Sequence, residues 1–187
     1  MSKVCEKDLL RLEKLKEENR NGTTFNELVL ENHQKIYSLF RRMVQTHDEA
    51  DDLTQETFIK VYKNFSKFKF QSSPYTWIYR IAVNTGINYL RGKKVKQFFG
   101  LEKVKNLPSS DNPVVSDERN TVLRQAVAKL SPKQQMVVLL RSFQELPFKQ
   151  IAIITDSTEN AVKVNFSHAL KSLKRIIRNM GVNYETL

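Results

Sequence analysis

The stretch DEADDLTQETF, residues 48–58, decides how the first half of this chain folds. Its apolar residues, and those that follow it, recur at intervals of three and four, which predicts a helix with one buried face. That face consists of Ala50, Leu53, Thr57, Phe58, Val61 and Phe65. The opposite side of the helix then faces outward and carries Asp51, Asp52, Gln55, Glu56 and Lys60.

This stretch is acidic although the chain as a whole is basic. Its five acids are Asp48, Glu49, Asp51, Asp52 and Glu56. Acids in the first turn favour the positive end of the helix dipole, which accounts for Asp48 and Glu49 but not for all five. The formal net charge of +11 and the pI near 9.7 predict a polyanionic partner such as nucleic acid. Because an acidic face repels a polyanion, we expect this face to meet solvent or a basic protein.

The composition argues against a cofactor enzyme and against a membrane protein. A length of 187 residues allows one domain or two small ones, and the single cysteine, Cys5, excludes an internal disulfide. The histidines lack a second ligand at metal-binding spacing, and no phosphate-binding glycine loop or GxSxG motif occurs. No apolar run reaches the roughly 20 residues that cross a bilayer. We therefore expect a cytoplasmic protein that is not an enzyme and binds no cofactor or metal.

Helical periodicity dominates the remaining sequence, and no strand alternation of useful length occurs. Residues 1–24 predict an N-terminal helical extension, with a charged helix over 6–20. Residues 25–44 predict a helix that packs on one face. That face consists of Leu28, Val29, Asn32, Ile36, Leu39, Phe40 and Met43.

Aromatic and basic residues alternate in the stretch NFSKFKFQSSPYTW, residues 64–77. Aromatic rings can stack unpaired bases while lysines hold the phosphate backbone, at roughly 1–3 kcal/mol per stacked base. Phe65 and Trp77 suit the core, which leaves a candidate surface for single-stranded DNA made of Phe68, Lys69, Phe70 and Gln71. The alternative is that most of these rings also belong to the core.

The next predicted helix follows the turn signal Ser72-Ser73-Pro74 and has two faces. The apolar face consists of Trp77, Ile78, Ile81, Ala82, Thr85 and Tyr89. The polar face recurs at helical spacing and consists of Thr76, Arg80, Asn84, Asn88 and Arg91. Side chains of these types contact base edges and phosphates, so we expect DNA on the polar face.

A change in composition at residues 106–118, NLPSSDNPVVSDE, predicts a flexible linker between two domains. Residues 118–130 then predict an amphipathic helix that buries Val122, Leu123, Ala126, Val127 and Leu130. Ser131 and Pro132 predict the capped start of a further helix, because serine is a good N-cap and proline suits a first helical turn.

The last segment has the layout of a helix-turn-helix. It comprises a short helix near residues 148–155, a tight turn, and a second helix capped by Ser157 or Thr158. Spacing predicts that the second helix buries Val162, Phe166, Ala169, Leu173 and Ile176. Its first turns then project Glu159, Asn160, Lys163, Val164 and Ser167, where a recognition helix meets base edges. Helical hairpins of this length also occur in proteins that do not bind DNA.

Together these motifs resemble a bacterial RNA polymerase sigma factor of the extracytoplasmic-function (ECF) group of the sigma-70 family. The resemblance covers roughly residues 25–177 and rests on DEADDLTQETFIKVYKNFSKF, SSPYTWIYRIAVNTGINYLR and LSPKQQMVVLLRSFQELPFKQIA. It implies an all-α fold of two small helical domains. Region 2, a helical bundle, corresponds to residues 25–95 and region 4, the helix-turn-helix domain, to 121–187, with a flexible linker over 96–120.

The resemblance also implies a role for each surface. The residues that would dock on the clamp helices of the largest polymerase subunit are Asp51, Asp52, Gln55 and Glu56. The residues that would bind the minus-ten element are Lys67, Phe68, Lys69, Phe70, Gln71, Arg80, Asn84, Asn88 and Arg91. The residues that would bind the minus-thirty-five element are Glu159, Asn160, Lys163, Val164 and Ser167. Members of the family are commonly held by an anti-sigma factor, which makes such a protein an expected partner.

The sequence departs from the family pattern in three places. Asp156-Ser157 occupies the place of the usual Gly-Ile turn, and Lys163-Val164-Asn165 that of the usual Lys-Ser-Arg. Pro147 replaces a usual serine cap, although proline is tolerated in a first helical turn. The missing arginine predicts weaker binding of the minus-thirty-five element.

The sequence therefore predicts a sigma factor that binds core RNA polymerase and promoter DNA and promotes melting. A stand-alone helix-turn-helix regulator, which would bind duplex DNA without polymerase, is the alternative. A metal-dependent nuclease with Asp48, Asp52 and Glu56 as its Mg²⁺ ligands is a weaker one, because acids on one helix lack a second element that closes the coordination shell.

Overall fold

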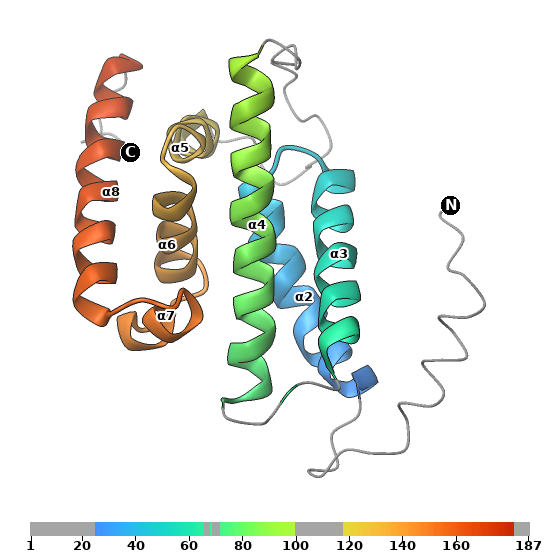
Figure 1. Ribbon diagram of the computed structural model, residues 1–187. Coiled ribbons are helices and arrows are strands. Elements are labelled where there is room, and N and C mark those ends of the chain that lie inside the picture. The colour runs from blue at the N-terminus through green and yellow to red at the C-terminus, as the bar shows by residue number, and fades with distance from the viewer. Residues whose placement is uncertain (1–24, 66–67, 69–71, 100–117, 182–187) are drawn as a thin grey trace.

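The structure is a computed structural model that describes residues 25–65, 68, 72–99 and 118–181. The predicted helix over 6–20 and most of the predicted linker lie outside the described residues. In the described ranges the chain forms helices and no strands, as predicted (Figure 1). The helices are α2 (Phe25–Met43), α3 (His47–Phe65), α4 (Pro74–Phe98), α5 (Glu118–Ala128), α6 (Pro132–Ser142), α7 (Phe148–Ile154) and α8 (Glu159–Asn179).

The first three helices, α2 to α4, pack against one another around a core. The predicted buried face of α3 is buried at all six positions, and α2 buries all of its predicted face except the half-buried Val29. Helix α4 begins where the sequence predicts, because the Ser73 hydroxyl accepts a hydrogen bond from the Thr76 amide and Pro74 occupies the first turn.

Helices α5 to α8 form the second half of the molecule. Ser131 caps α6 through a capping box with Gln134, and Pro132 follows in the first turn. Helix α7, the turn at residues 155–158 and α8 make the predicted helix-turn-helix, in which Thr158 is the N-cap of α8. Helix α8 buries Val162, Ala169 and Leu173 as predicted, whereas Phe166 and Ile176 are half-buried and Ile177 is buried instead.

The two halves share one continuous core rather than standing apart. Helix α4 lies between α2 and α3 on one side and α6 and α7 on the other (Figure 1). Its second buried face contains Tyr79, Val83 and Leu90, which belong to the same core as Met136 and Leu140 of α6, and the buried Gly86. The helices approach closely at Gly86, where an added Cβ would lie 2.7 Å from Met136 Cε.

Polar contacts accompany this shared core. Tyr79 Oη donates to Gln144 Oε1 at 2.9 Å, and burial, aided by contact with Tyr75, raises the pKa of Tyr79, which keeps the hydroxyl protonated as a donor. Lys94 Nζ donates to the Leu130 carbonyl at 2.8 Å. Each bond joins residues on opposite sides of the predicted linker, so both halves are held in a closed arrangement.

Candidate protein-binding and nucleic-acid-binding surfaces

The outward face of α3 forms an acidic surface, defined here as Asp51, Asp52, Gln55 and Glu56. All four side chains are exposed. Glu56 pairs with Lys60 at 2.6 Å, and Lys60 Nζ also donates to Thr85 Oγ1 of α4 at 3.1 Å. Asp51, Asp52 and Gln55 make no side-chain hydrogen bond or ion pair with any described residue. The acidic surface is therefore open to a partner.

Glu49 has a structural role that separates it from the acidic surface. Its carboxylate accepts hydrogen bonds from the Gln45 and Thr46 amides, while the Thr46 hydroxyl accepts one from the Glu49 amide, which makes a capping box at the start of α3. Tyr89 Oη and Lys93 Nζ of α4 donate to the same carboxylate. Burial opposes ionisation of Glu49, but these donors outweigh it and lower its pKa to about 2.

The capping box could have been found from the sequence, since Thr46 and Glu49 have the spacing of a Ser/Thr-x-x-Glu signal. The contacts with Tyr89 and Lys93 could not, because they join residues 40 and 44 positions apart.

Only part of the predicted single-strand surface falls within the described residues. Lys67, Lys69, Phe70 and Gln71 lie outside them. Phe68 is half-buried and stacks on Trp77 with ring centroids 4.6 Å apart and an interplanar angle of 22°. Phe65 is buried as predicted, whereas Trp77 is half-buried between Phe65 and Phe68.

Some side chains of the predicted polar face of α4 are exposed to solvent, and others pack against the rest of the molecule. Asn84, Asn88 and Arg91 are exposed along one side of the helix. Arg80 is half-buried, and its Nη2 donates to the Ile153 carbonyl of α7 at 2.9 Å. Thr76 is buried, and its hydroxyl is hydrogen-bonded to the hydroxyl of the N-cap Ser73. Thr76 was therefore wrongly placed on the exposed face, and Arg80 contacts the second half of the molecule.

The first turns of α8 present the predicted reading face to solvent. Asn160, Lys163, Val164 and Ser167 are all exposed and are spaced along one side of the helix, with Val164 54% exposed although it is apolar. Glu159 is half-buried and pairs with Lys163 at 2.6 Å. In the turn before α8, Asp156 has a φ of +51°, a left-handed conformation that favours glycine.

The described residues provide little support for metal chemistry. No group of three His, Cys, Asp or Glu side chains in them is arranged to hold a metal ion. Asp48, Asp52 and Glu56 follow one another along α3, and no other described helix adds a ligand to them. Among the described helices none is long and apolar enough to cross a membrane.

Comparisons with known proteins cover both halves of the molecule. A family model described as Sigma-70 region 2 matches residues 28–95, and one described as Sigma-70, region 4 matches residues 121–173. The RNA polymerase sigma-H factor of Pseudomonas aeruginosa is 30% identical over 166 residues, which cover 82% of this chain and 86% of that protein. The ECF RNA polymerase sigma-E factor of Escherichia coli (strain K12) is 30% identical over 161 residues, which cover 80% and 84%.

Solved structures share the fold at lower identity. The sigma factor RpoE of Bartonella quintana, in complex with the anti-sigma factor NepR, superposes with a TM-score of 0.61 at 21% identity, over 82% of this chain and 96% of that one. CnrH, in complex with the cytosolic domain of CnrY, superposes with a TM-score of 0.60 at 14% identity, over 92% and 97%. With its region 2 and region 4 matches in the expected order, the chain belongs to the sigma-70 family of RNA polymerase sigma factors, in the extracytoplasmic-function group, and is an initiation factor rather than an enzyme.

Proposed function

We propose that the acidic surface on α3 docks on a basic surface of core RNA polymerase. The observation that supports this proposal is the exposure of Asp51, Asp52 and Gln55, whose side chains make no hydrogen bond or ion pair with any described residue. An acidic surface on a chain of net charge +11 repels DNA and attracts a basic protein. The acidic surface therefore selects polymerase, and the basic remainder of the chain is left for the promoter.

Two separate surfaces meet the promoter. Asn84, Asn88 and Arg91 of α4, together with the loop from Lys67 to Gln71, hold the minus-ten element. The exposed face of α8 enters the major groove at the minus-thirty-five element, where Val164 suits a thymine methyl and Lys163 a guanine or a phosphate. Melting requires no catalytic group, because binding of unpaired bases offsets the few kcal/mol that unstacking costs per base.

The closed arrangement has to open before both promoter elements are bound. Elements centred 10 and 35 base pairs upstream lie about 85 Å apart along B-DNA, at 3.4 Å per base pair. A compact chain of this length has a radius of gyration of only about 16 Å. We therefore expect polymerase to separate the two halves and the linker to span the distance between them. Arg80 then leaves the Ile153 carbonyl and becomes available to the minus-ten element.

The test of this function is run-off transcription combined with a pull-down of core polymerase. Asp52→Lys with Glu56→Lys should abolish binding of polymerase while the helix stays folded, because exposed charges contribute little to stability. A matched control is Glu31→Lys with Glu145→Lys, which makes the same charge change at exposed positions away from the acidic surface. Equal polymerase binding by the two double variants would refute the assignment.

The same assay separates the proposed function from its alternative. A stand-alone helix-turn-helix regulator would bind promoter duplex without polymerase and would not support run-off transcription. An anti-sigma factor remains an expected partner, supported by the complex in which the Bartonella quintana relative was solved. A cytoplasmic localisation is expected for a factor that acts on polymerase.

A further inference from the structure

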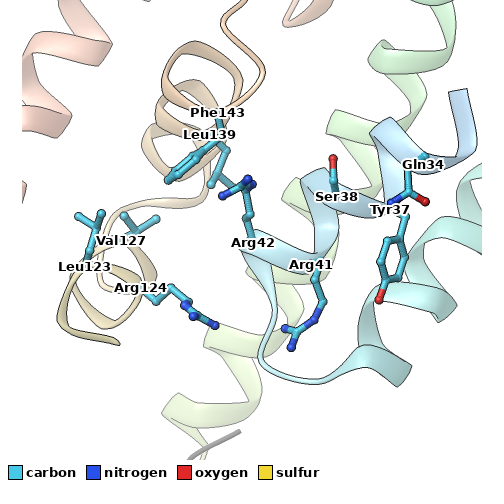
Figure 2. A pocket seen from close by; sticks show the side chains of 10 residues that line it. All are labelled: Gln34, Tyr37, Ser38, Arg41, Arg42, Leu123, Arg124, Val127, Leu139 and Phe143. Carbon is cyan, nitrogen blue, oxygen red and sulfur yellow. The ribbon is translucent and has the colours of Figure 1, made fainter. Parts of the chain in front are cut away.

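A groove lies where the two halves of the molecule meet, away from the acidic surface and from the reading face of α8. It is lined by α2 on one side and by α5 and α6 on the other (Figure 2). Its volume is about 410 Å³, within the range of roughly 300–1,000 Å³ typical of small-molecule sites. The groove is thus large enough for a compact organic molecule.

The two walls of the groove differ in chemistry. Helices α5 and α6 supply an apolar wall made of Leu123, Val127, Leu139 and Phe143. Arg41 and Arg42 extend from α2, and Arg124 extends from α5 toward α2 (Figure 2). None of the described residues that line the groove is acidic. The groove therefore joins an apolar surface to uncompensated positive charge.

The arginines keep donors available for a ligand. Arg41 Nη1 donates to the Gln45 carbonyl at 3.1 Å, and Arg41 Nη2 donates to no described residue. The Arg42 guanidinium lies over the Phe143 ring, 4.4 Å from its centroid, which holds it at the edge of the apolar wall. Arg124 is exposed and makes no ion pair with any described residue. Arg41 and Arg124 line the groove with no acidic partner among the described residues, so an anion in the groove would accept charge-assisted hydrogen bonds from their outer guanidinium nitrogens.

We infer that this groove binds a small amphiphilic anion, namely a ring or acyl group that carries one carboxylate, sulfonate or phosphate. The apolar part of such a molecule packs against Val127, Leu139 and Phe143, and the anionic group accepts hydrogen bonds from Arg41 and Arg124. Leu123, which the sequence placed inward, is 37% exposed because it borders this open groove. Duplex DNA fits the arginines but leaves the apolar wall uncovered, so a small molecule matches both walls better.

Occupation of the groove affects the whole molecule because its walls belong to different halves. A ligand that bridges α2 and α5 binds the closed arrangement and not an open one, and it therefore stabilises the closed arrangement by mass action. If the chain opens to bind a promoter, as proposed above, the ligand acts as an inhibitor of initiation. This regulatory consequence rests on the proposed function, whereas binding itself does not.

The experiment uses the full chain and the fluorescent anion 1-anilinonaphthalene-8-sulfonate, with N-phenyl-1-naphthylamine as a neutral analogue of similar shape. We expect saturable binding of one sulfonate per chain and binding of the neutral analogue that is at least about ten-fold weaker. Arg41→Gln with Arg124→Gln should weaken binding of the sulfonate at least about ten-fold, the loss expected when charge-assisted hydrogen bonds are removed. Arg175→Gln with Arg178→Gln, exposed positions on α8 outside the groove, should leave it unchanged.

Folding is controlled by circular dichroism, and Arg124→Glu serves as a second variant because a single exposed position tolerates the change. Equal binding of the sulfonate by wild type and Arg124→Glu would overturn the inference. Equal affinity for the charged and neutral probes would also overturn it, because the groove would then show no preference for an anion. The assay contains neither polymerase nor promoter. Its failure is therefore distinct from a failure of the run-off experiment.

Discussion

At the scale of single residues, Asp156 shows what one departure from the family pattern costs. The turn between α7 and α8 requires a left-handed backbone, and Asp156 adopts it with a φ of +51°. Glycine enters this region without a steric penalty, whereas an aspartate does so only at some cost. The turn is therefore formed by a residue that tolerates the conformation rather than by one that favours it.

We expect Asp156→Gly to raise the free energy of unfolding by about 0.5–1 kcal/mol, because relief of backbone strain exceeds the added chain entropy of glycine. The measurement is urea unfolding followed by circular dichroism. Ser157→Gly is the matched control, since Ser157 has no positive φ, and it should lower stability instead. The same sign for both variants would contradict this explanation.

Glu49 predicts a dependence of stability on pH. Its pKa is lowered from the ordinary value of 4.5 to about 2 in the folded chain. A lowered carboxyl pKa stabilises the fold above pH 4.5, and that contribution is lost as the pH falls toward 2. Glu49→Gln should lower the free energy of unfolding at pH 7 by about 2 kcal/mol. This is less than the whole pKa difference would give, because the carboxylate is partly exposed and solvent screens its charge.

Unfolding by urea at pH 7, 4 and 3 measures this effect. The difference between wild type and Glu49→Gln should shrink toward the lowest pH, whereas Glu31→Gln at an exposed position of α2 should match wild type throughout. A difference that stays constant with pH would show that Glu49 acts through packing and not through its charge.

At the scale of elements, α8 combines a buried face with an exposed reading face. Val162, Ala169 and Leu173 hold the helix against the rest of the second half, and this leaves Asn160, Lys163 and Val164 in solvent. Asn165, which replaces the usual arginine of the family, is half-buried and lines a small cavity with Ile87 and Met136. In the closed arrangement this position faces the first half of the molecule rather than DNA.

Lys163→Ala should weaken promoter binding by the holoenzyme and reduce the slope of log K against log salt by about one counterion. Loss of the pair with Glu159 contributes little, because that pair is exposed. Electrophoretic mobility shifts across a salt series measure the slope, with Lys174→Ala, three turns along α8, as the control. An unchanged slope would place this face of α8 away from the phosphates.

At the scale of the whole molecule, α4 is the element that both halves share. A helix that buries one side against α2 and α3 and another against α6 and α7 keeps one exposed side, which carries Asn84, Asn88 and Arg91. Gly86 makes this double packing possible, since a side chain there would meet Met136, Met43 and Phe40. The two methionine neighbours can move, but the Phe40 ring at 3.3 Å is less free to do so, so the close approach of α4 to its neighbours favours a glycine in the middle of a long helix, where glycine otherwise weakens the helix.

Gly86→Leu should crowd Met136 of α6 and also Met43 and Phe40 of α2, so it should loosen the packing of α4 against both halves and open the molecule. Small-angle X-ray scattering should then show a radius of gyration above the value of about 16 Å expected for a compact chain. Gly92→Leu is the matched control, because a Cβ at Gly92 meets nothing within 4 Å. The helical content from circular dichroism should stay near that of wild type. An unchanged radius of gyration in folded Gly86→Leu protein would mean that the two halves do not rely on this contact.

Local sequence determined the features that depend on residues within about four positions of one another. The starts of α4, α6 and α8 follow from Ser73, Ser131 and Thr158, because a cap bonds an amide two or three residues ahead. The buried faces of α2 and α3 follow from periodicity, since each helix buries one stripe. The family follows from the same local motifs.

Only the tertiary structure decided how the two halves meet. Helix α4 has buried residues on more than one side, so its periodicity could not reveal that Tyr79, Val83 and Leu90 face the second half. Arg80 reaches the carbonyl of Ile153 across 73 positions, and Leu123 borders a groove whose other wall is α2. Contacts of this kind leave no trace in local spacing, because their energy comes from surfaces that become neighbours only when the chain closes.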